Sequence, residues 1–555
     1  MSDAPRLEPL LELRGLTVAL PDGSDRPFAV EQVSFEIMPN EILCVVGESG
    51  SGKSVIGHAI MGLLPKPALR VAAGAIMLRE QNVVTMDDTE QREMRGHRVG
   101  MIFQEPMTAL NPLMRIGAQI EEVLQIHTDM NRTQRRAHVL EMIAAVGLAN
   151  SEAIRRSYPF RLSGGQRQRV MIAMALALKP DLLIADEPTT ALDVMTQKQI
   201  LELIKTIQRE RHMAVMFITH DFGVVAEIAD RVAVMRQGRL VEIGAAEAVL
   251  NRPQHHYTRQ LIASLPGQAA VRPPFVHEGA PLLVAEHINK SFALAGGGFW
   301  SKARRLVVAD DINLAIHPGE TVGLVGSSGS GKSTLARSVV GLIKPDGGRL
   351  LFKGTDLLSL DRRAFKPHRR DVQMVFQDPY ASLNPRHRVG DIIAQGPIAF
   401  GEDPAKALAQ ARELLELVGL PASAAERFPH EFSGGQRQRV SIARALAVKP
   451  SLLIADEPVS ALDASVQSQV LRLLDDIRER LGLAMLFITH DLRIAAEICD
   501  TVGVMQHGRI VEYGPASEVL QNPRDPYTRS LLEALPGRHW HIPRSFADAD
   551  VAVVG

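Results

Sequence analysis

The sequence predicts an α/β fold built as two tandem domains. Residues 47–54 (GESGSGKS) and 326–333 (GSSGSGKS) both fit the glycine-rich pattern G-x-x-x-x-G-K-[S/T]. An apolar run that is typical of a buried strand precedes each of them, at 42–46 and at 322–325. After the first, residues 55–64 can form a helix. Further short motifs recur after both stretches in the same order, which indicates a duplicated domain.

The bulk composition supports two or more globular domains. A chain of 555 residues is too long for a single core, and its net charge of −1 lacks the basic excess of a general nucleic-acid binder. Cys44 and Cys499 lie in apolar runs and are expected to be small buried side chains. No apolar signal region and no uncharged run of about 18–20 residues is present. We therefore expect a soluble protein of the reducing cytoplasm, with no nucleic-acid partner.

The two glycine-rich stretches have the chemistry of phosphate loops. Their glycines let backbone N–H groups approach phosphate oxygens, and the following helix N-terminus adds a partial positive charge. Lys53 and Lys332 can reach the outer phosphates of a nucleotide, while the hydroxyls of Ser54 and Ser333 can ligate magnesium. The candidate binding residues of the loops are Gly47, Ser49, Gly50, Gly52, Lys53, Ser54, Gly326, Ser328, Gly329, Gly331, Lys332, Ser333 and Thr334.

The remaining elements of the first half follow in order. Strands are expected at 10–20 and 28–37, and a short apolar strand at 100–103 ends at Gln104. The segment from there to about residue 158 has helical periodicity. Residues 162–166 (LSGGQ) then open a helix-compatible run that continues to residue 178. Its N-terminus is either a second phosphate site or an ordinary serine-capped helix start.

Two later strands end in ionisable residues. The apolar run 182–186 closes with Asp186, followed by Glu187, and the run 214–218 leads to His220. An aspartate at the C-terminal end of a strand suits a magnesium ligand, and the next glutamate is placed to polarise water. Taken alone, each feature is also typical of a strand that simply ends at solvent.

The second half repeats these features with fixed spacing. Gln377 corresponds to Gln104 at an offset of 273 (377 − 104), and the S-G-G-Q motif recurs at an offset of 270 (433 − 163). Asp456, Glu457 and His490 keep the offset of 270. Because the spacing from the S-G-G-Q motif to the histidine is identical in both halves, coincidence is excluded.

The composition also predicts the domain boundaries. Residues 266–281 are rich in proline and glycine and are expected to be a linker between domains at 1–265 and 282–537. The tail 538–555 has no periodicity and is expected to be loosely ordered. A second irregular stretch, 295–305, is expected to form a hairpin loop of the second domain.

In this order of motifs, nearly the whole chain resembles tandem ABC-type ATPases. The resemblance implies two P-loop domains, each with a mainly parallel sheet core, an antiparallel β subdomain and a helical subdomain. It also implies that the domains pair head to tail, with ATP and Mg²⁺ between the phosphate loop of one domain and the S-G-G-Q signature of the other.

The resemblance implies the same roles in both halves. Glu187 and Glu457 would orient the attacking water, and His220 and His490 would sense the γ-phosphate. The implied magnesium ligands are Ser54, Gln104, Asp186, Ser333, Gln377 and Asp456. The signature residues that would complete the ATP sites are Ser163, Gly165, Gln166, Ser433, Gly435 and Gln436.

Departures from the family pattern are few. Phe432 stands where the first half has Leu162, and Val55 stands where the second has Thr334. Neither change removes a ligand, so two competent sites are expected. Phe28 is the candidate for the aromatic that stacks on adenine in the first half, whereas the irregular stretch obscures its counterpart.

Elements outside the core motifs narrow the resemblance. The N-x-P/N-P…Y-T segments at 251–258 and 522–528, with the sequences at 105–112 and 378–385, resemble the oligopeptide/dipeptide importer subfamily. That implies an energy-coupling subunit, peripheral on the cytoplasmic face of the inner (plasma) membrane. Its partners would be two integral membrane permease subunits and an extracytoplasmic solute-binding protein. Some relatives carry a cysteine-ligated iron–sulfur cluster, which this chain lacks the cysteines to hold.

Two alternatives compete with the importer. Soluble tandem ABC ATPases that act on ribosomes or DNA share the order of motifs. However, this chain lacks both the long charged helical linker of the ribosomal type and the zinc-binding cysteines of the DNA-repair type. An exporter is disfavoured by the importer-like segments after each core.

Overall fold

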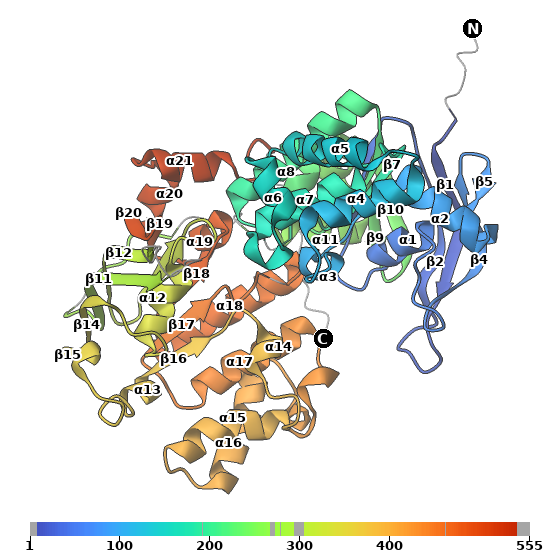
Figure 1. Cartoon of the computed structure of the whole chain (residues 1–555). Coiled ribbons are helices and arrows are strands. Elements are labelled where there is room, and N and C mark those ends of the chain that lie inside the picture. Colours follow the sequence, from blue (N-terminus) through green and yellow to red (C-terminus); the bar gives the residue numbers. More distant parts are fainter. Residues whose placement is uncertain are drawn as a thin grey trace. The chain divides into compact units, whose positions relative to one another are not determined.

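The computed structural model describes residues 8–190, 192–266, 272–277, 279–293, 305–460 and 462–540 (Figure 1). The chain forms two units. Unit 1 comprises Met1–Leu192, Thr196–Ser264 and Pro536–Gly555, and unit 2 comprises Asp193–Met195 and Leu265–Leu535. The hairpin loop expected at 295–305 lies outside the described residues except for its last residue, and so does the tail beyond residue 540.

Unit 1 contains two sheets. The smaller one is antiparallel, in the order β2-β1-β4-β5, and the larger has the order β10-β9-β3-β8-β7-β6. In the larger sheet β9, β3, β8, β7 and β6 are parallel neighbours, and β10 is an antiparallel edge. The strands are β1 (Leu11–Ala19), β2 (Phe28–Ile37), β3 (Ile42–Val46), β4 (Arg70–Leu78), β5 (Gln81–Asn82), β6 (Val99–Ile102), β7 (Leu182–Asp186), β8 (Ala214–Thr219), β9 (Arg231–Arg236) and β10 (Arg239–Ala245).

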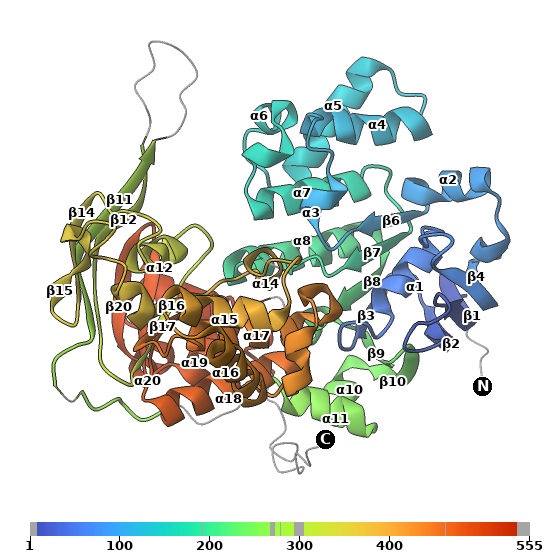
Figure 2. The same cartoon turned by 90° about the horizontal axis from the view of Figure 1, so that it is seen from below.

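The helices of unit 1 fall into two groups. α4, α5 and α6 lie together against α7 as a helical subdomain (Figure 2), while α1 follows the phosphate loop. The helices are α1 (Lys53–Ile60), α2 (Asp88–His97), α3 (Pro106–Ala109), α4 (Ile116–His127), α5 (Arg132–Ala145), α6 (Ser151–Arg156), α7 (Gly164–Ala175), α8 (Val194–Arg211), α9 (Phe222–Ile228), α10 (Ala246–Asn251) and α11 (His256–Ala263).

Unit 2 repeats this topology, with sheets β12-β11-β14-β15 and β16-β17-β18-β13-β19-β20. Its strands are β11 (Leu283–Ala293), β12 (Arg305–Ile316), β13 (Thr321–Val325), β14 (Gly347–Phe352), β15 (Thr355–Asp356), β16 (Val372–Val375), β17 (Leu452–Asp456), β18 (Ala484–Thr489), β19 (Thr501–Gln506) and β20 (Arg509–Pro515). Its helices are α12 (Lys332–Val339), α13 (His368–Asp371), α14 (Pro379–Ser382), α15 (Val389–Ala399), α16 (Pro404–Leu417), α17 (Gly434–Leu446), α18 (Ala464–Leu481), α19 (Leu492–Ile498), α20 (Ala516–Gln521) and α21 (Pro526–Glu533).

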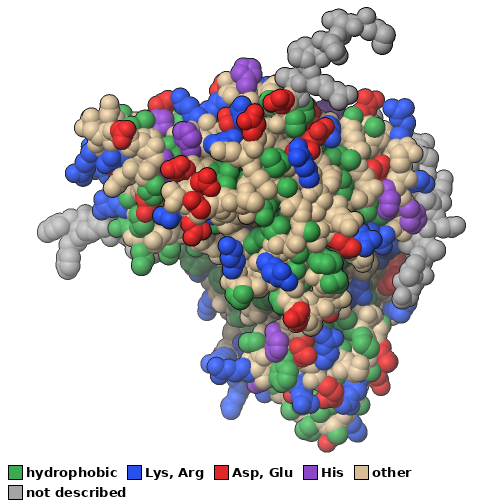
Figure 3. All heavy atoms as spheres, turned by 90° about the vertical axis from the view of Figure 1, so that its right-hand side faces the viewer, with side chains coloured by type: hydrophobic (Ala, Val, Ile, Leu, Met, Phe, Trp, Pro, Cys, Tyr) green, Lys and Arg blue, Asp and Glu red, His purple; other side chains and the backbone are tan. Residues whose placement is uncertain are grey.

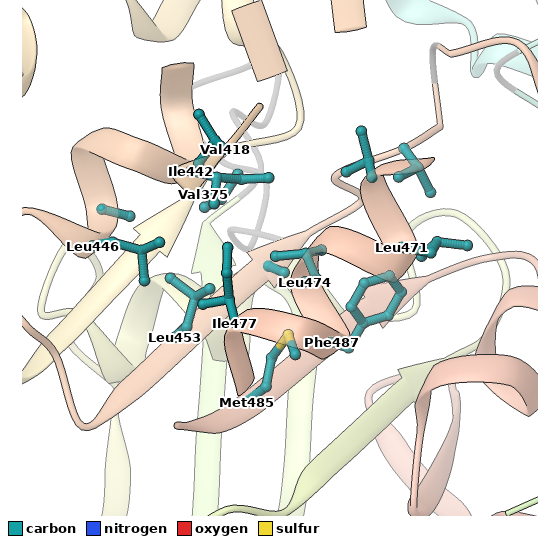
Figure 4. Packing of buried hydrophobic residues seen from close by; sticks show 14 of the residues in the cluster. Val375, Val418, Ile442, Leu446, Leu453, Leu471, Leu474, Ile477, Met485 and Phe487 are labelled. Atoms are coloured by element: carbon teal, nitrogen blue, oxygen red, sulfur yellow. The ribbon is translucent and has the colours of Figure 1, made fainter. Parts of the chain in front are cut away.

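The continuous apolar runs become the inner strands of the parallel sheets. Every residue of β3, β7, β8, β13, β17 and β18 is buried, as expected for parallel strands that are covered on both faces. In unit 2, Leu474 and Ile477 of α18 pack over the sheet beside Phe487 (Figure 4). Cys44 and Cys499 are buried as predicted, and burial raises the pKa of both thiols.

Two helices begin earlier and end earlier than the sequence predicts. α1 starts at Lys53 and stops at Ile60, because the chain turns at Gly62 with a φ of 63°. α7 starts inside the signature, at Gly164, and ends at Ala175. In both helices the first turn is built from motif residues, so the motif and the helix N-terminus are one feature.

Charged side chains of both signs are interspersed on the face that Figure 3 shows. This mixture accords with the net charge of −1. Among the described residues, no helix is both long enough and apolar enough to cross a bilayer.

Candidate functional site

In each phosphate loop, a glycine with a positive φ is the residue directly before the helix. Gly52 caps α1 with a φ of 99°, and Gly331 caps α12 with a φ of 108°. A Cβ at Gly52 would lie 2.6 Å from the carbonyl oxygen of Ala29, and one at Gly331 would lie even closer to that of Val308. Only glycine fits both this backbone conformation and the close approach of the neighbouring strand.

The loop lysines are buried and held by the loops themselves. Lys53 Nζ donates to the carbonyl oxygens of Gly47 (2.7 Å) and Glu48 (2.9 Å). Lys332 Nζ repeats this with Gly326 (2.7 Å) and Ser327 (2.8 Å). Burial lowers the pKa of Lys332. Both loops therefore surround a lysine ammonium group, whose positive charge would attract a phosphate.

A serine and an aspartate meet beside each lysine. Ser54 Oγ donates to Asp186 Oδ1 at 2.9 Å, and Ser333 Oγ donates to Asp456 Oδ1 at the same distance. Asp186 is 2% exposed and Asp456 is 1% exposed, and burial raises the pKa of both carboxyls. A hydroxyl and a carboxylate oxygen at this spacing are hard ligands of the kind that Mg²⁺ prefers.

Glu187 adopts a left-handed backbone conformation at the end of β7. Its φ is 46°, and its N–H donates to the carbonyl oxygen of Ile218 at 2.9 Å. Gln104 Nε2 donates to Glu187 Oε2 at 3.0 Å, and His220 Nδ1 lies 3.3 Å from Oε1. Burial opposes ionisation of Glu187, but His220 and the hydroxyl of Thr190 together lower its pKa to about 2. The carboxylate is therefore ionised, as a residue that orients water requires.

The second half reproduces this cluster. Glu457 has a φ of 48°, Gln377 Nε2 donates to its Oε2 at 2.9 Å, and His490 Nδ1 lies 3.3 Å from Oε2. Burial opposes ionisation of both members of the pair, yet their attraction lowers the pKa of Glu457 and raises that of His490. Glu187 and Glu457 thus share their left-handed backbone conformation as well as their glutamine and histidine neighbours.

The signature motifs start helices α7 and α17. Ser163 Oγ accepts from the N–H of Gln166 at 3.3 Å, and Gln166 Oε1 accepts from the N–H of Ser163 at 3.0 Å. Ser433 and Gln436 form the same capping box. A Cβ at Gly165 would lie 2.6 Å from Thr196 Cγ2 of α8, so packing alone requires glycine there. That these residues also complete an ATP site stays a prediction.

Sequence reasoning missed a tyrosine that contacts each phosphate loop. The hydroxyl of Tyr527 accepts from the N–H of Ser327 at 3.1 Å and donates to its Oγ at 3.0 Å. The hydroxyl of Tyr257 accepts from the N–H of Glu48 at 3.4 Å. Both tyrosines belong to the Y-T segments after each core. The segments were visible in the sequence, but the contact across about 200 residues was not.

The aromatic candidates lie on the antiparallel sheets. Phe28 begins β2, is half-buried, and lines a surface hollow together with Arg26 and Arg236. In unit 2, Phe292 near the end of β11 is 41% exposed, and Lys290 Nζ lies 5.4 Å from its ring centroid. Phe292 lies on β11, which corresponds to β1 of unit 1, so it does not occupy the position of Phe28, which begins β2.

Comparison with known proteins agrees with this geometry. The ABC transporter family matches residues 30–190 and 309–460. The family "Oligopeptide/dipeptide transporter, C-terminal region" matches residues 241–277 and 511–544, which include both Y-T segments.

Two curated relatives match along nearly the whole chain. The chain is 46% identical to the Peptidoglycan transport ATP-binding protein YejF of Agrobacterium fabrum, over 95% of this chain and 96% of the relative. It is 44% identical to the Glutathione import ATP-binding protein GsiA of Escherichia coli K12, over 95% of this chain and 89% of the relative. The chain therefore belongs to the ABC transporter family and is an ATPase with two ATP-binding domains in one polypeptide.

Proposed function

We propose that this protein couples ATP hydrolysis to the import of oligopeptides, dipeptides or related small peptides. The observation that carries the proposal is the peptide-transporter C-terminal region that follows each ATPase core. In both units a tyrosine of this region touches the phosphate loop. A transport-specific element is thus in direct contact with the nucleotide machinery. The names of the relatives, one for peptidoglycan transport and one for glutathione import, point to peptide-containing solutes.

At each site, the chain's own residues supply binding and orientation. The lysine attracts the β- and γ-phosphates, and the glutamate accepts a hydrogen bond from the attacking water and orients it for in-line attack. The histidine beside the glutamate senses the γ-phosphate. Bound Mg²⁺ would neutralise phosphate charge, with Ser54, Gln104 and Asp186 as its ligands in unit 1 and Ser333, Gln377 and Asp456 in unit 2.

ATP binding by both units is further proposed to bring them together head to tail. Ser163, Gly165 and Gln166 would then complete the site of Lys332, and Ser433, Gly435 and Gln436 would complete that of Lys53. Because the signature lies at a helix N-terminus, its N–H groups and partial positive charge suit the γ-phosphate. Hydrolysis removes that phosphate and reopens the pair.

The segments after Gln104 and Gln377 are proposed to pass this motion to two membrane permease subunits. Large apolar side chains are exposed there: Met107 is 49% exposed and Leu113 85% in unit 1, and Tyr380 is 65% exposed in unit 2. Exposed apolar groups beside a hydrolysis site suit contact with another protein. The chain would work as a peripheral protein on the cytoplasmic face of the inner membrane, with an extracytoplasmic solute-binding protein delivering the peptide.

Uptake of labelled peptides tests this function. A strain that lacks the chain should lose uptake of a labelled dipeptide, tripeptide or glutathione, and the parent gene should restore it. A gene with Glu187→Gln and Glu457→Gln should not restore it, and a labelled amino acid taken up by another route serves as the control. Unchanged uptake of all three peptides in the deletion strain would refute peptide import while leaving the ATPase assignment intact.

A further inference from the structure

One cluster outside the ATP sites has the side chains of a metal centre. His277, His317 and Glu320 each direct a ligand atom into one region, and these three atoms all lie within 4.8 Å of one another. His317 follows β12 and Glu320 precedes β13, so a tight turn of unit 2 holds both. His277 comes from the segment 272–277, which also belongs to unit 2.

The spacing within the turn matches metal coordination. His317 Nδ1 lies 3.2 Å from Glu320 Oε2. Zn²⁺ binds His nitrogen and carboxylate oxygen at roughly 2.0–2.2 Å, so two ligands of a tetrahedral ion are about 3.3 Å apart. The rings of His277 and His317 have centroids 4.2 Å apart. Two imidazoles and one carboxylate form a known zinc ligand set that leaves a fourth position for water.

Unit 1 explains why this carboxylate needs a cation. There, Glu41 occupies the same turn, and its Oε1 accepts from Arg231 Nη1 at 3.1 Å. In unit 2 the residue at the position of Arg231 is Thr501, whose hydroxyl donates to Glu320 Oε1 at 2.6 Å. Glu320 is 0% exposed. Its buried carboxylate therefore lacks the guanidinium partner that Glu41 has in unit 1. Buried carboxylates are normally paired with a cation or ligate a metal.

The second change between the units supplies the ligand. The residue after β2 is Met38, and its N–H donates to Glu41 Oε2 at 2.6 Å. The corresponding residue in unit 2 is His317, which keeps that backbone hydrogen bond at 2.8 Å and adds an imidazole. Around the same carboxylate, unit 1 therefore has an arginine and a methionine where unit 2 has a threonine and a histidine.

The third ligand is brought in by a docked segment. Arg272 Nη2 donates to Asp475 Oδ2 at 2.5 Å, Arg272 Nε donates to the carbonyl oxygen of Glu497 at 3.0 Å, and Arg272 Nη1 lies 3.6 Å from Asp500. These contacts fix the chain five residues before His277. The ring of Phe275 packs edge-on against His277 at 5.7 Å between centroids. The contacts of Arg272 and Phe275 thus hold the segment that places His277 beside the turn.

We propose that His277, His317 and Glu320 bind a divalent transition metal of the Zn²⁺ class, which fastens the segment 272–277 to unit 2. Thr501 is a positioning residue, because its hydroxyl orients the carboxylate from the opposite oxygen. The site is structural: it lies outside the ATP sites and is independent of the solute that is transported.

Metal titration of the full-length, nucleotide-free protein tests the site. After stripping with EDTA and removal of the chelator, Zn²⁺ binding is measured by calorimetry, and Co²⁺ is used as a spectroscopic probe of tetrahedral coordination. The parent should bind one Zn²⁺ that His277→Ala and His317→Met bind more weakly. Because losing a hydrogen-bond partner of a ligand already costs roughly 10–100-fold in affinity, losing a ligand should cost at least that.

The variants include matched controls. His317→Met installs the residue that unit 1 has at this position, so it should fold, and unchanged basal ATPase activity of both variants will verify this. His287→Ala removes an exposed histidine of the same unit that pairs with Asp311 at 2.6 Å, and it should leave Zn²⁺ affinity unchanged. The chain has 18 histidines, so weak binding elsewhere is expected. Equal Zn²⁺ affinity in the parent and both ligand variants, or a Co²⁺ spectrum without tetrahedral bands, would overturn the proposal.

Discussion

The two proposed hydrolysis sites hold their lysines, serines and aspartates in the same way, but their glutamates do not have the same hydrogen-bond donors. Thr190 Oγ1 donates to the Glu187 carboxylate at 2.9 Å. At the matching position of unit 2, Ser460 Oγ donates to the backbone carbonyl oxygen of Glu457 at 3.2 Å. The two units thus share the lysine, serine, aspartate, glutamine, glutamate and histidine of the proposed sites, whereas the hydroxyl beside the glutamate has a different hydrogen-bond acceptor in each unit.

The largest expected effect concerns the glutamates themselves. Glu187→Gln should leave ATP binding intact and remove most turnover, and Glu457→Gln should do the same, since each glutamate has a glutamine and a histidine as neighbours. General bases typically contribute about 10²–10⁴-fold, which the double variant should show in full. Steady-state ATPase rates and fluorescent-nucleotide binding measure both properties. Parent-like hydrolysis by Glu187→Gln would show that Glu187 is not the base. A strong effect of the substitution in only one half would show that the two ATP sites are not equivalent.

The next effect concerns the two cores. Phe217 and Phe487 occupy equivalent positions of β8 and β18, and each is 0% exposed. Replacing either by alanine should destabilise its own unit by about 3–5 kcal/mol, through lost burial and the cavity that remains. Denaturant unfolding followed by hydrogen exchange would assign the loss to one unit. A loss spread equally over both units would mean that the two unfold as one cooperative block.

The tyrosines give a smaller and unequal effect. Tyr527→Phe removes two hydrogen bonds to Ser327, whereas Tyr257→Phe removes one long bond to Glu48. A hydrogen bond is worth about 1 kcal/mol, so the loss of two bonds in Tyr527→Phe should weaken ATP binding at its loop by up to about thirtyfold. Tyr257→Phe should change it less. Binding measured in the background of the opposite Lys→Ala variant (Lys53 or Lys332) isolates each loop, and a larger effect for Tyr257→Phe would contradict the geometry.

The smallest effect is the loss of the hydroxyl beside the glutamate, whose cost in stability should depend on pH in unit 1 and not in unit 2. The pKa of Glu187 is about 2 in the folded protein, below its ordinary 4.5, so its ionisation stabilises the fold above 4.5. That contribution is lost as the pH falls from 4.5 to 2. Thr190→Val removes one donor, and should destabilise by less than about 1 kcal/mol near neutral pH, with the difference disappearing in that acid window. Ser460→Ala, whose hydroxyl bonds to the backbone, should show no such dependence in unfolding curves.

Much of the fold follows from local pattern. Apolar runs such as Ile42–Val46 identify the buried parallel strands, and the glycines of the loops identify the turns that precede α1 and α12. These features depend on neighbouring residues, so a single sequence contains them. The fixed offsets between the halves then indicate which residues of the two halves correspond to each other.

The rest depends on contacts between distant segments. Nothing near Glu187 in the sequence predicts its left-handed backbone, which is held by the carbonyl oxygen of Ile218 on the adjacent strand. The contact of Tyr257 with the phosphate loop likewise depends on how α11 packs against the unit. The composition of residues 266–281 predicts a linker, but it gives no sign that Arg272 within it is held by Asp475 and Asp500.

The docking of Arg272 decides where this polypeptide could be divided into two separately encoded halves. A break between Ser264 and Arg272 would leave the guanidinium in the same product as Asp475 and Asp500. A break at residue 281, where the composition places the end of the linker, would send it to the other product. Asp500 is 7% exposed, so it and Asp475 would then share Arg478 as their remaining ion-pair partner among the described residues. The C-terminal product should therefore be more stable on its own when the cut precedes Arg272 than when it follows residue 281, as denaturant unfolding of the two products would measure.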